Sequence, residues 1–451
     1  MAKSKSKKIM LEDALVPVDE QPYQIPENWC WTFLSNVADW GSGGTPSRKN
    51  PDYYGGYIPW IKTGELEDGY IFDSEEKITE DAVAHSSAKL FPIDSVLIAM
   101  YGATIGKTAI LGIPATTNQA CACARCRDVL NNKYLFYYLR SQKDTFIAKG
   151  KGGAQPNISQ DIIRNHMIPL PPLAEQKRIV EQIESLFSKL DMAREKAEFV
   201  ISCFEERMVA IIHKAFEGVL TRKWREVNNV SCDSWKMVPL KNCGRWFGGG
   251  TPATSVGAYW EKGDIPWITS KDMKDRVIED SIMHITMAGV ENSSANYCDE
   301  PAVLFVMRSG ILRRVFPVCM VNRPFTVNQD LKACVPAMNQ DYLYWFCTGY
   351  EKDIRDKCMK SGTTVESVEA KKLMDYEVPV ASANEQTEVV KQIESLINKE
   401  ESVKELAKNV IEKIDAMKKL ILAKAFRGEL GTNISLEESS IELLKKTIEE
   451  G

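Results

Sequence analysis

The stretch Ile168–Leu186 reads IPLPPLAEQKRIVEQIESL, and Val378–Leu396 reads VPVASANEQTEVVKQIESL. Both stretches share a Glu-Gln dipeptide, end on QIESL and lie 210 positions apart. In each copy a proline-marked segment leads into a run without proline or glycine, a pattern typical of a long helix. A repeat of this length exceeds any solenoid unit, so it indicates duplication of a whole domain together with its helix.

Other doubled motifs extend the repeat across most of the chain. The helical runs end on HKAFEGVL from His213 and AKAFRGEL from Ala423. Further upstream the pairs are GSGGTP and FGGGTP, YIPWIKTGEL and DIPWITSKDM, and TTNQA and TVNQD, beginning at Gly41, Phe247, Tyr57, Asp264, Thr116 and Thr326. The offset between the copies drifts from 206 to 210 along these pairs, which indicates small loop insertions between two equivalent modules.

The long runs carry apolar residues at alternating spacings of three and four, which is the pattern of a coiled-coil seam. The first run extends from Leu173 to Phe216. At 1.5 Å per residue, a helix over these residues would be about 65 Å long. Only Glu400 interrupts the second run. The predicted seam contains Ile183, Leu186, Leu190, Phe204 and Ile211 in the first helix and Ile393, Leu396, Val403, Val410, Ile414 and Met417 in the second.

The modules before the helices mix short apolar runs with Gly, Asn and Asp turns. SVLIAM from Ser95 and AVLFVM from Ala302 read as buried strands, while KYLFYYLR from Lys133 and DYLYWFCTGY from Asp341 read as helices. We therefore expect mixed α/β modules with an antiparallel or mixed sheet.

The composition is that of an ordinary globular protein. Of 451 residues, 44% are hydrophobic and 26% charged, with a net charge of −5, which excludes a polycation that coats nucleic acid. We find no secretion signal and no run of apolar residues that could span a membrane, so we expect a cytoplasmic protein. The 12 cysteines should then be reduced thiols, and the group Cys121, Cys123 and Cys126 lacks a second pair at zinc-ligand spacing.

No motif indicates catalysis. YGATIGKT from Tyr101 resembles a phosphate-binding loop, but only three residues separate Gly102 from Gly106, and the second copy has no Gly-Lys pair. The dinucleotide-binding, hydrolase, metalloprotease and adenine-methyltransferase motifs are absent from the sequence. These observations disfavour a stand-alone nuclease or ATPase.

Local positive charge is compatible with DNA binding, but basic surface is common on proteins of any function. Arg308, Arg313 and Arg314 lie close in sequence, and the first module has Lys107, Lys149 and Lys151. Lys and Arg hold phosphates, while Arg reads guanine and Asn or Gln reads adenine. The alternative for Arg313 and Arg314 is a solvated surface turn. For Asn118, Gln119, Asn328 and Gln329 the alternative is a turn whose side chains cap backbone groups.

The ordered set of doubled motifs, with the segments PENWCWTFL at Pro26–Leu34, GKGGAQPNIS at Gly150–Ser159 and SGTTVESV at Ser361–Val368, resembles the specificity subunits of type I restriction-modification systems. The resemblance covers residues 20–430. It implies two target-recognition domains with mixed sheets, joined by two long antiparallel coiled-coil helices.

The expected domains are an N-terminal tail, a target-recognition domain, a central spacer helix, a second target-recognition domain, a C-terminal spacer helix and a C-terminal tail, at 1–24, 25–168, 169–221, 222–378, 379–431 and 432–451. Each target-recognition domain would read one half of an asymmetric, bipartite sequence in double-stranded DNA. The length of the two helices would set the gap between the halves.

The resemblance also implies partners. Two modification subunits would carry S-adenosylmethionine and methylate adenine, while restriction subunits would use ATP and Mg to translocate and cut DNA in defence against phage. This chain would bind no cofactor or metal and would not be an enzyme. The alternative function is a coiled-coil scaffold that presents two protein-binding modules and has no role on DNA.

We predict the following DNA contacts: Thr45, Arg48, Lys49, Lys62, Tyr101, Lys107, Asn118, Gln119, Lys149 and Lys151 in the first module, and Thr251, Thr269, Lys271, Arg308, Arg313, Arg314, Asn328 and Gln329 in the second. The doubled GGTP turns would lie near the DNA backbone or the modification subunit, or would be purely structural.

Overall fold

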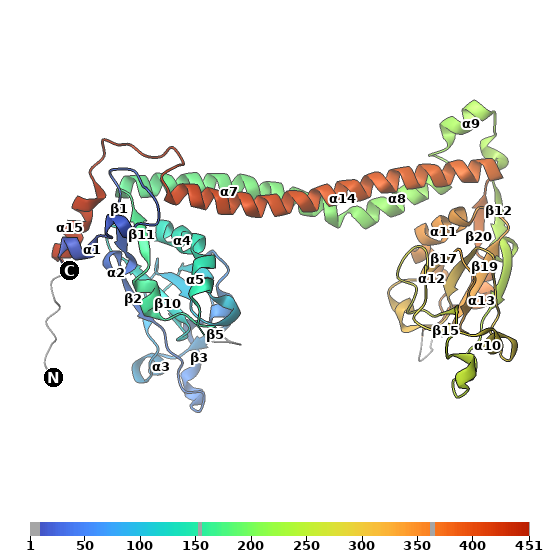
Figure 1. Cartoon of the computed structure of the whole chain (residues 1–451), viewed down its shortest axis with the longest axis horizontal. Helices are drawn as coiled ribbons and strands as arrows, with labels where there is room; N and C mark the ends of the chain where they lie inside the picture. The colour runs from blue at the N-terminus through green and yellow to red at the C-terminus, as the bar shows by residue number, and fades with distance from the viewer. Residues whose placement is uncertain (1–9, 152–155, 361–365, 451) are drawn as a thin grey trace. The chain divides into compact units, whose positions relative to one another are not determined.

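The computed structural model describes residues 10–151, 156–360 and 366–450 and divides the chain into two compact units (Figure 1). Unit 1 comprises residues 1–196 and 410–451, and unit 2 comprises residues 197–409. Each unit holds one module with parts of the long helices. Residues 152–155 and 361–365 of the two glycine-rich segments lie outside the described residues.

The described residues of module 1 form three sheets. A five-stranded sheet has the order β2-β10-β7-β8-β4, a four-stranded sheet has the order β5-β3-β9-β6, and β1 pairs with β11. The strands are β1 Cys30–Phe33, β2 Ala38–Ser42, β3 Tyr54–Ile61, β4 Tyr70–Ile71, β5 Glu76–Ile78, β6 Leu90–Phe91, β7 Val96–Ala99, β8 Thr108–Leu111, β9 Ala115–Thr117, β10 Cys121–Cys126 and β11 Met167–Leu170. The short helices are α1 Leu11–Ala14, α2 Leu34–Val37, α3 Glu80–His85, α4 Asn132–Ser141, α5 Lys143–Lys149, α6 Gln160–Arg164 and α15 Ser440–Glu450.

Module 2 repeats this plan with sheets β13-β19-β16-β17, β15-β14-β18 and β12-β20. Both modules combine antiparallel ladders with an equivalent parallel pair, β3 with β9 and β14 with β18, and module 1 has a further parallel pair, β4 with β8. The predicted mixed α/β class is confirmed. The strands are β12 Lys236–Pro239, β13 Gly244–Gly248, β14 Ile265–Ile268, β15 His284–Ile285, β16 Ala302–Val306, β17 Val318–Val321, β18 Thr326–Val327, β19 Leu331–Pro336 and β20 Glu377–Val380. The short helices are α9 Arg222–Asn228, α10 Met287–Glu291, α11 Gln340–Gly349, α12 Glu351–Cys358 and α13 Ala370–Met374.

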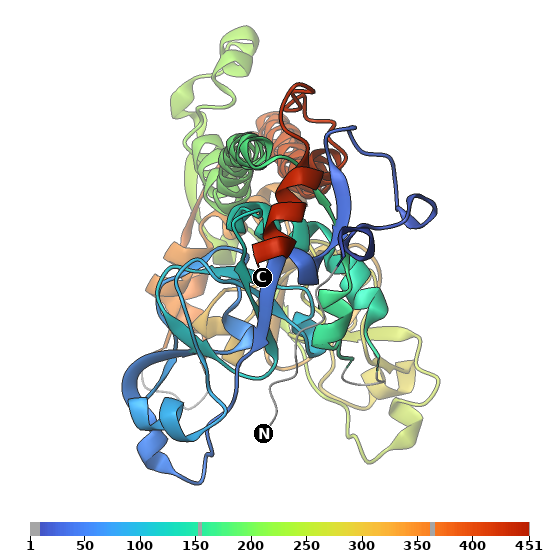
Figure 2. The same cartoon turned by 90° about the vertical axis from the view of Figure 1, so that its left-hand side faces the viewer.

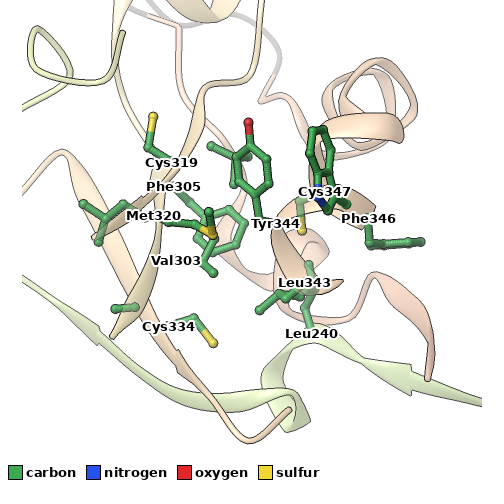
Figure 3. Packing of buried hydrophobic residues seen from close by; sticks show 14 of the residues in the cluster. Leu240, Val303, Phe305, Cys319, Met320, Cys334, Leu343, Tyr344, Phe346 and Cys347 are labelled. Carbon is green, nitrogen blue, oxygen red and sulfur yellow. The ribbon is translucent and has the colours of Figure 1, made fainter. Parts of the chain in front are cut away.

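The core of each module lies between its main sheet and one aromatic helix. In module 2 every residue of β16 is buried, because the strand is covered on both faces, as its continuous apolar sequence predicts. Figure 3 shows Val303 and Phe305 of this strand within a cluster that also holds Leu343, Phe346 and Cys347 of α11. In module 1 the aromatic helix α4 packs against β7 and β8 of the main sheet in the same way.

The long helices are α7 Leu173–Ser202, α8 Phe204–Phe216 and α14 Ala383–Phe426. In unit 1, Asp191 contacts Lys418 and Arg194 contacts Asp415, so α14 runs opposite to α7. In unit 2, the Lys404 ammonium lies over the Phe204 ring. These contacts, together with an ion pair between α8 and α14 described below, confirm the antiparallel arrangement within each unit.

The first spacer helix was expected to be continuous, but it is divided at Cys203. Arg207 donates a hydrogen bond to the Val200 carbonyl (2.9 Å) and pairs with Glu400 (2.6 Å). The guanidinium thus binds a carbonyl that would otherwise accept the amide of Phe204, which accounts for the local change. The same ion pair explains why Glu400 interrupts the apolar pattern.

Of the residues predicted for the seam, Ile183, Phe204, Ile393 and Ile414 are buried, while Leu186, Leu190, Ile211 and Leu396 are half-buried. The prediction is wrong for Val403, Val410 and Met417, which are 44%, 42% and 49% exposed. In α14 the packed positions are one residue further on, at Ile397, Lys404, Ile411 and Lys418.

Lysine side chains account for this shift. The Lys404 ammonium lies 3.9 Å from the ring centre of Phe204, and that of Lys418 lies 5.1 Å from the ring centre of Phe187. A lysine can pack its aliphatic stem and place its charge over an aromatic ring. A pattern that counts only apolar residues therefore passes over these two positions.

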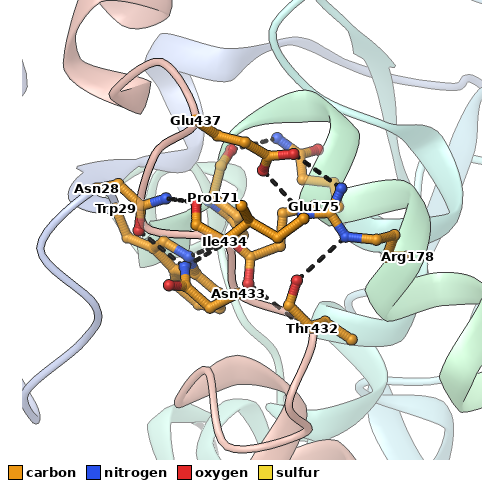
Figure 4. Close-up of polar contacts among 10 residues, drawn as sticks. Asn28, Trp29, Pro171, Glu175, Arg178, Thr432, Asn433, Ile434 and Glu437 are labelled. Carbon is orange, nitrogen blue, oxygen red and sulfur yellow. Dashed lines mark hydrogen bonds and ion pairs between the residues drawn. The ribbon is translucent and has the colours of Figure 1, made fainter.

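The helices α7 and α14 each begin in a polar knot, a cluster of polar contacts around a glutamate. The knot of α7 binds the segment that follows α14, and that of α14 binds the segment that follows α8. Figure 4 shows this knot in unit 1, where the buried Glu175 accepts hydrogen bonds from Trp29 Nε1 and Asn433 Nδ2, both at 2.8 Å. In unit 2 the equivalent Glu385 pairs with Arg225 at 2.7 Å. The Glu-Gln dipeptide recurs because its acid anchors these segments.

The helices α1 and α15, close to the two ends of the described chain, pack together in unit 1. Figure 2 shows α15 beside α1 and α2, and Leu444 of α15 is fully buried there with Ala14. No helix within the described residues is long and apolar enough to cross a membrane.

Candidate DNA interface

Several loops of module 1 meet where neighbouring strands end. The amide of Gly44 donates to the Thr117 carbonyl at 2.9 Å, and the amide of Asn118 donates to the Ile61 carbonyl at 3.0 Å. These bonds join the loops that follow β2, β9 and β3. We call this region the strand-end cluster, which comprises Gly43–Pro46, Lys62, Tyr101, Asn118 and Gln119 in module 1 and Gly249–Pro252, Thr269, Arg308, Asn328 and Gln329 in module 2.

Module 2 makes the same bonds. The amide of Gly250 donates to the Val327 carbonyl at 3.1 Å, and the amide of Asn328 donates to the Ile268 carbonyl at 3.0 Å. Motifs that are far apart in the sequence, GGTP, IPWI and the Asn-Gln turn, therefore recur because they build one structure in each module.

The first glycine of each GGTP loop is required by close backbone packing. A Cβ atom on Gly43 would lie 2.0 Å from the Thr117 carbonyl oxygen, and one on Gly249 would lie 1.7 Å from the Val327 carbonyl oxygen. Because the obstructing atoms belong to backbone, no side-chain rotation could make room for a larger residue.

The tryptophan of each IPWI segment holds the same loop from beneath. The indole Nε1 of Trp60 donates to the Gly44 carbonyl at 3.0 Å, and that of Trp267 donates to the Gly250 carbonyl at 2.9 Å. Both indoles are buried. The loop backbone is therefore fixed on both sides before any ligand binds.

The next residue of each loop pairs with the Asn-Gln turn. The hydroxyl of Thr45 donates to Gln119 Oε1, and the hydroxyl of Thr251 donates to Gln329 Oε1. All four residues are exposed. Each module thus presents one preformed Thr-Gln pair on its surface.

The asparagines of these turns have a local structural role. Asn118 Oδ1 accepts from the Ala120 amide at 3.2 Å, and Asn328 Oδ1 accepts from the Asp330 amide at 3.1 Å. This is the turn-capping alternative that the sequence left open. A DNA contact by either asparagine stays a prediction.

Sequence reasoning missed an acid beneath each cluster. Glu65 accepts from the Lys62 amide at 2.9 Å, and Asp272 accepts from the Thr269 amide at 2.8 Å. Each carboxylate also accepts from a second backbone amide ten residues further on. The signal was an acid three residues after the position occupied by Lys62 and Thr269, in both copies.

Cations of module 1 share one carboxylate. Arg48 lies 2.7 Å from Glu76 with its guanidinium over the Tyr54 ring at 4.3 Å, and Lys62 Nζ lies 3.1 Å from Glu76. Arg48, and to a lesser extent Lys62, lower the pKa of Glu76 below its ordinary value. The two cations are therefore held in place, while more than half of the Arg48 side chain stays exposed.

The loop after β7 reaches the same edge, because the Met100 amide donates to the Ala120 carbonyl at 2.8 Å. In module 2 the Met307 amide donates to the Asp330 carbonyl, also at 2.8 Å. These loops present different exposed residues, Tyr101 in module 1 and Arg308 in module 2. The two clusters thus share a frame and differ in outward side chains.

Other predicted contacts lie in turns beside the clusters. Arg313 pairs with Glu366 at 2.8 Å, and Lys149 Nζ lies 3.2 Å from His166 Nδ1, so both cations are engaged within the protein. Lys49, Lys151, Lys271 and Arg314 are exposed, and Lys107 is half-buried. The described residues contain no group of His, Cys, Asp and Glu side chains that could hold a metal ion.

Comparison with known proteins assigns the fold. A family model described as "Type I restriction modification DNA specificity domain" matches residues 26–198 and 233–413. The EcoR124I/EcoR124II specificity subunit of Escherichia coli is 30% identical over 57% of this chain and 61% of its own length. The EcoKI specificity subunit of Escherichia coli strain K12 is 22% identical over 94% of this chain and 95% of its own length.

Solved structures share the fold. The HsdS subunit from Thermoanaerobacter tengcongensis matches with a TM-score of 0.62 and 21% identity, covering 92% of this chain and all of its own. Two modules of one plan, with an antiparallel helix pair within each unit, agree with this shared fold. This chain belongs to the type I restriction-modification DNA specificity family, whose members recognise DNA target sequences.

Proposed function

We propose that this chain reads a DNA sequence in two different halves separated by an unspecified gap, with one half read by each module. The observation that carries this proposal is the duplicated strand-end cluster. Its frame is the same in both modules, but the outward residues differ, with Tyr101 and the half-buried Lys62 in one and Arg308 and the half-buried Thr269 in the other. Two similar frames with different outward side chains suit two different half-sites.

The chain would act as a non-catalytic subunit in the cytoplasm. Its duplicated modules offer two similar docking surfaces, which suits two copies of one modification subunit. Those subunits would carry S-adenosylmethionine and methylate adenine within the target. Restriction subunits would supply ATP- and Mg-dependent translocation and cleavage.

Single-molecule methylation sequencing of host DNA, with and without this gene, tests the proposal. We expect a two-part N6-methyladenine motif with a fixed gap to disappear with the gene. To separate a silent modification subunit from a failure of the proposal, the reconstituted complex is then tested for salt-dependent binding to that duplex. A folded complex that binds no duplex DNA at low salt would favour the scaffold function.

A further inference from the structure

The exposed side chains of the strand-end cluster fall into two classes. One exposed position differs between the modules, with Tyr101 in one and Arg308 in the other, as does the half-buried position of Lys62 and Thr269. The Thr-Gln pair is the same in both modules although its four residues are exposed. A buried residue can be retained for packing, but an exposed pair does not contribute to the core, so its recurrence calls for another explanation.

We infer that Thr45–Gln119 and Thr251–Gln329 grip the sugar-phosphate backbone of DNA in the same way at both half-sites. This inference rests on the proposed function. Two half-sites with different bases have the sugar-phosphate backbone in common, so a pair that contacts DNA in the same way at both must contact the backbone. Base selection then belongs to the positions that differ.

The hydrogen bonding of the pair supports this assignment. Since the threonine hydroxyl donates to Oε1 of the glutamine, that oxygen is engaged within the protein. The Nε2 amide retains two N–H donors, and the hydroxyl oxygen retains acceptor lone pairs. Phosphate oxygens accept hydrogen bonds from neutral amides, whereas recognition of adenine by glutamine uses Oε1 and Nε2 together.

The frame beneath the pair holds it ready for contact. Gly43 packs against backbone, and the Trp60 indole binds the Gly44 carbonyl, so the Thr45 backbone is fixed. A group fixed before binding loses little conformational entropy when DNA arrives. In module 1 the partly exposed Arg48 of the same loop adds positive charge that attracts phosphate.

The test uses the complex of this chain with its modification subunits. Binding is measured by fluorescence anisotropy on three duplexes: the target, the target with its first half scrambled, and the target with its second half scrambled. For Gln119→Ala we expect affinity for all three to fall by the same factor, about 3- to 10-fold, as for the loss of one hydrogen bond. Tyr101→Ala is the comparison, and it should change discrimination at one half-site only.

Two charge variants separate DNA contact from a structural role. Gln119→Lys should steepen the dependence of log affinity on log salt by about 0.9, as one added phosphate contact does. Gln119→Glu can still accept from Thr45 but should weaken binding more than Gln119→Ala does. Equal effects of Ala, Glu and Lys on DNA binding, or a change in base discrimination by Gln119→Ala, would overturn the inference.

A loss of affinity for the modification subunit with DNA binding retained would instead assign the pair to a protein contact, and would also overturn it. If the wild-type complex bound no target duplex, the proposed function itself would fail. If the wild type binds and the variants behave otherwise than stated, the backbone inference alone fails. The equivalent substitutions at Gln329 repeat the test in module 2.

Discussion

The guanidinium of Arg225 lies 2.7 Å from the carboxylate of Glu385 at the start of α14, and their side chains are 10% and 0% exposed. Thr221 donates to the same carboxylate oxygen at 2.9 Å. Removing one partner of a buried pair leaves an uncompensated charge in the interior, which is far more costly than losing a surface pair.

We expect Arg225→Leu to reduce the stability of unit 2 by about 3–5 kcal/mol. Native-state hydrogen exchange of the first turns of α14 would measure the change. The matched control is Arg222→Ala, which breaks the exposed Arg222–Glu226 pair and should cost about 0–1 kcal/mol. Similar effects of the two variants would contradict the buried-pair argument.

The GGTP glycines can be tested by adding one methyl group. Gly43→Ala should destabilise unit 1 by about 1–3 kcal/mol, because the new Cβ would lie 2.0 Å from a backbone oxygen. Gly64→Ala is the control, since no atom lies within 4 Å of its ideal Cβ position. Thermal unfolding of both variants checks the prediction, which fails if Gly43→Ala unfolds at the wild-type temperature.

A buried histidine should make unit 1 sensitive to acid. Burial, with a smaller contribution from the Lys149 ammonium, lowers the pKa of His166 to about 4 from 6.5. Between these values the unfolded chain binds more protons than the folded chain. The contribution of neutral His166 to the free energy of unfolding should therefore be fully present above about pH 6.5. It should fall as the pH drops towards 4, by up to about 3 kcal/mol.

Unfolding of unit 1 measured between pH 4.5 and 7.5 tests this expectation. The His166→Gln variant should lose stability less steeply towards low pH than the wild type. His85→Gln is the control, since the His85 side chain is 68% exposed. A wild-type slope that His166→Gln leaves unchanged would assign the acid sensitivity to other groups.

The proposed gap between half-sites should follow helix length. Removing four residues from each long helix, at 198–201 and 407–410, shortens a helical path by about 6 Å, or about two base pairs. Methylation sequencing should then report the same half-sites with a gap about two base pairs shorter. An unchanged gap would exclude the helices as the spacer.

The two equivalent modules could be predicted because the motifs that form their buried strands and turns recur in the sequence. The continuous apolar runs of β7 and β16 became buried strands, and the doubled motifs met in space. The seam failed at Val403 because Lys404 takes the packed position with its aliphatic stem, and residue type alone does not reveal this.

The acids beneath the clusters escaped prediction for a different reason. Glu65 and Asp272 are two of 62 acidic residues, and their role comes from the hydrogen bonds that they accept from backbone amides. Those amides become neighbours only after the chain folds. The turn-capping role of Asn118 was foreseen as an alternative because asparagine forms such bonds locally.

The first and last strands of each module are hydrogen-bonded partners, with Cys30 opposite Leu170 in one and Lys236 opposite Val380 in the other. The chain therefore enters and leaves each module through two paired strands. A gene segment that encodes everything between those two strands could be replaced as a cassette, provided that the new segment kept the residues that pack on the long helices, such as Tyr137 against Phe187. New DNA targets could then arise by recombination in one step, without a gradual redesign of the whole chain.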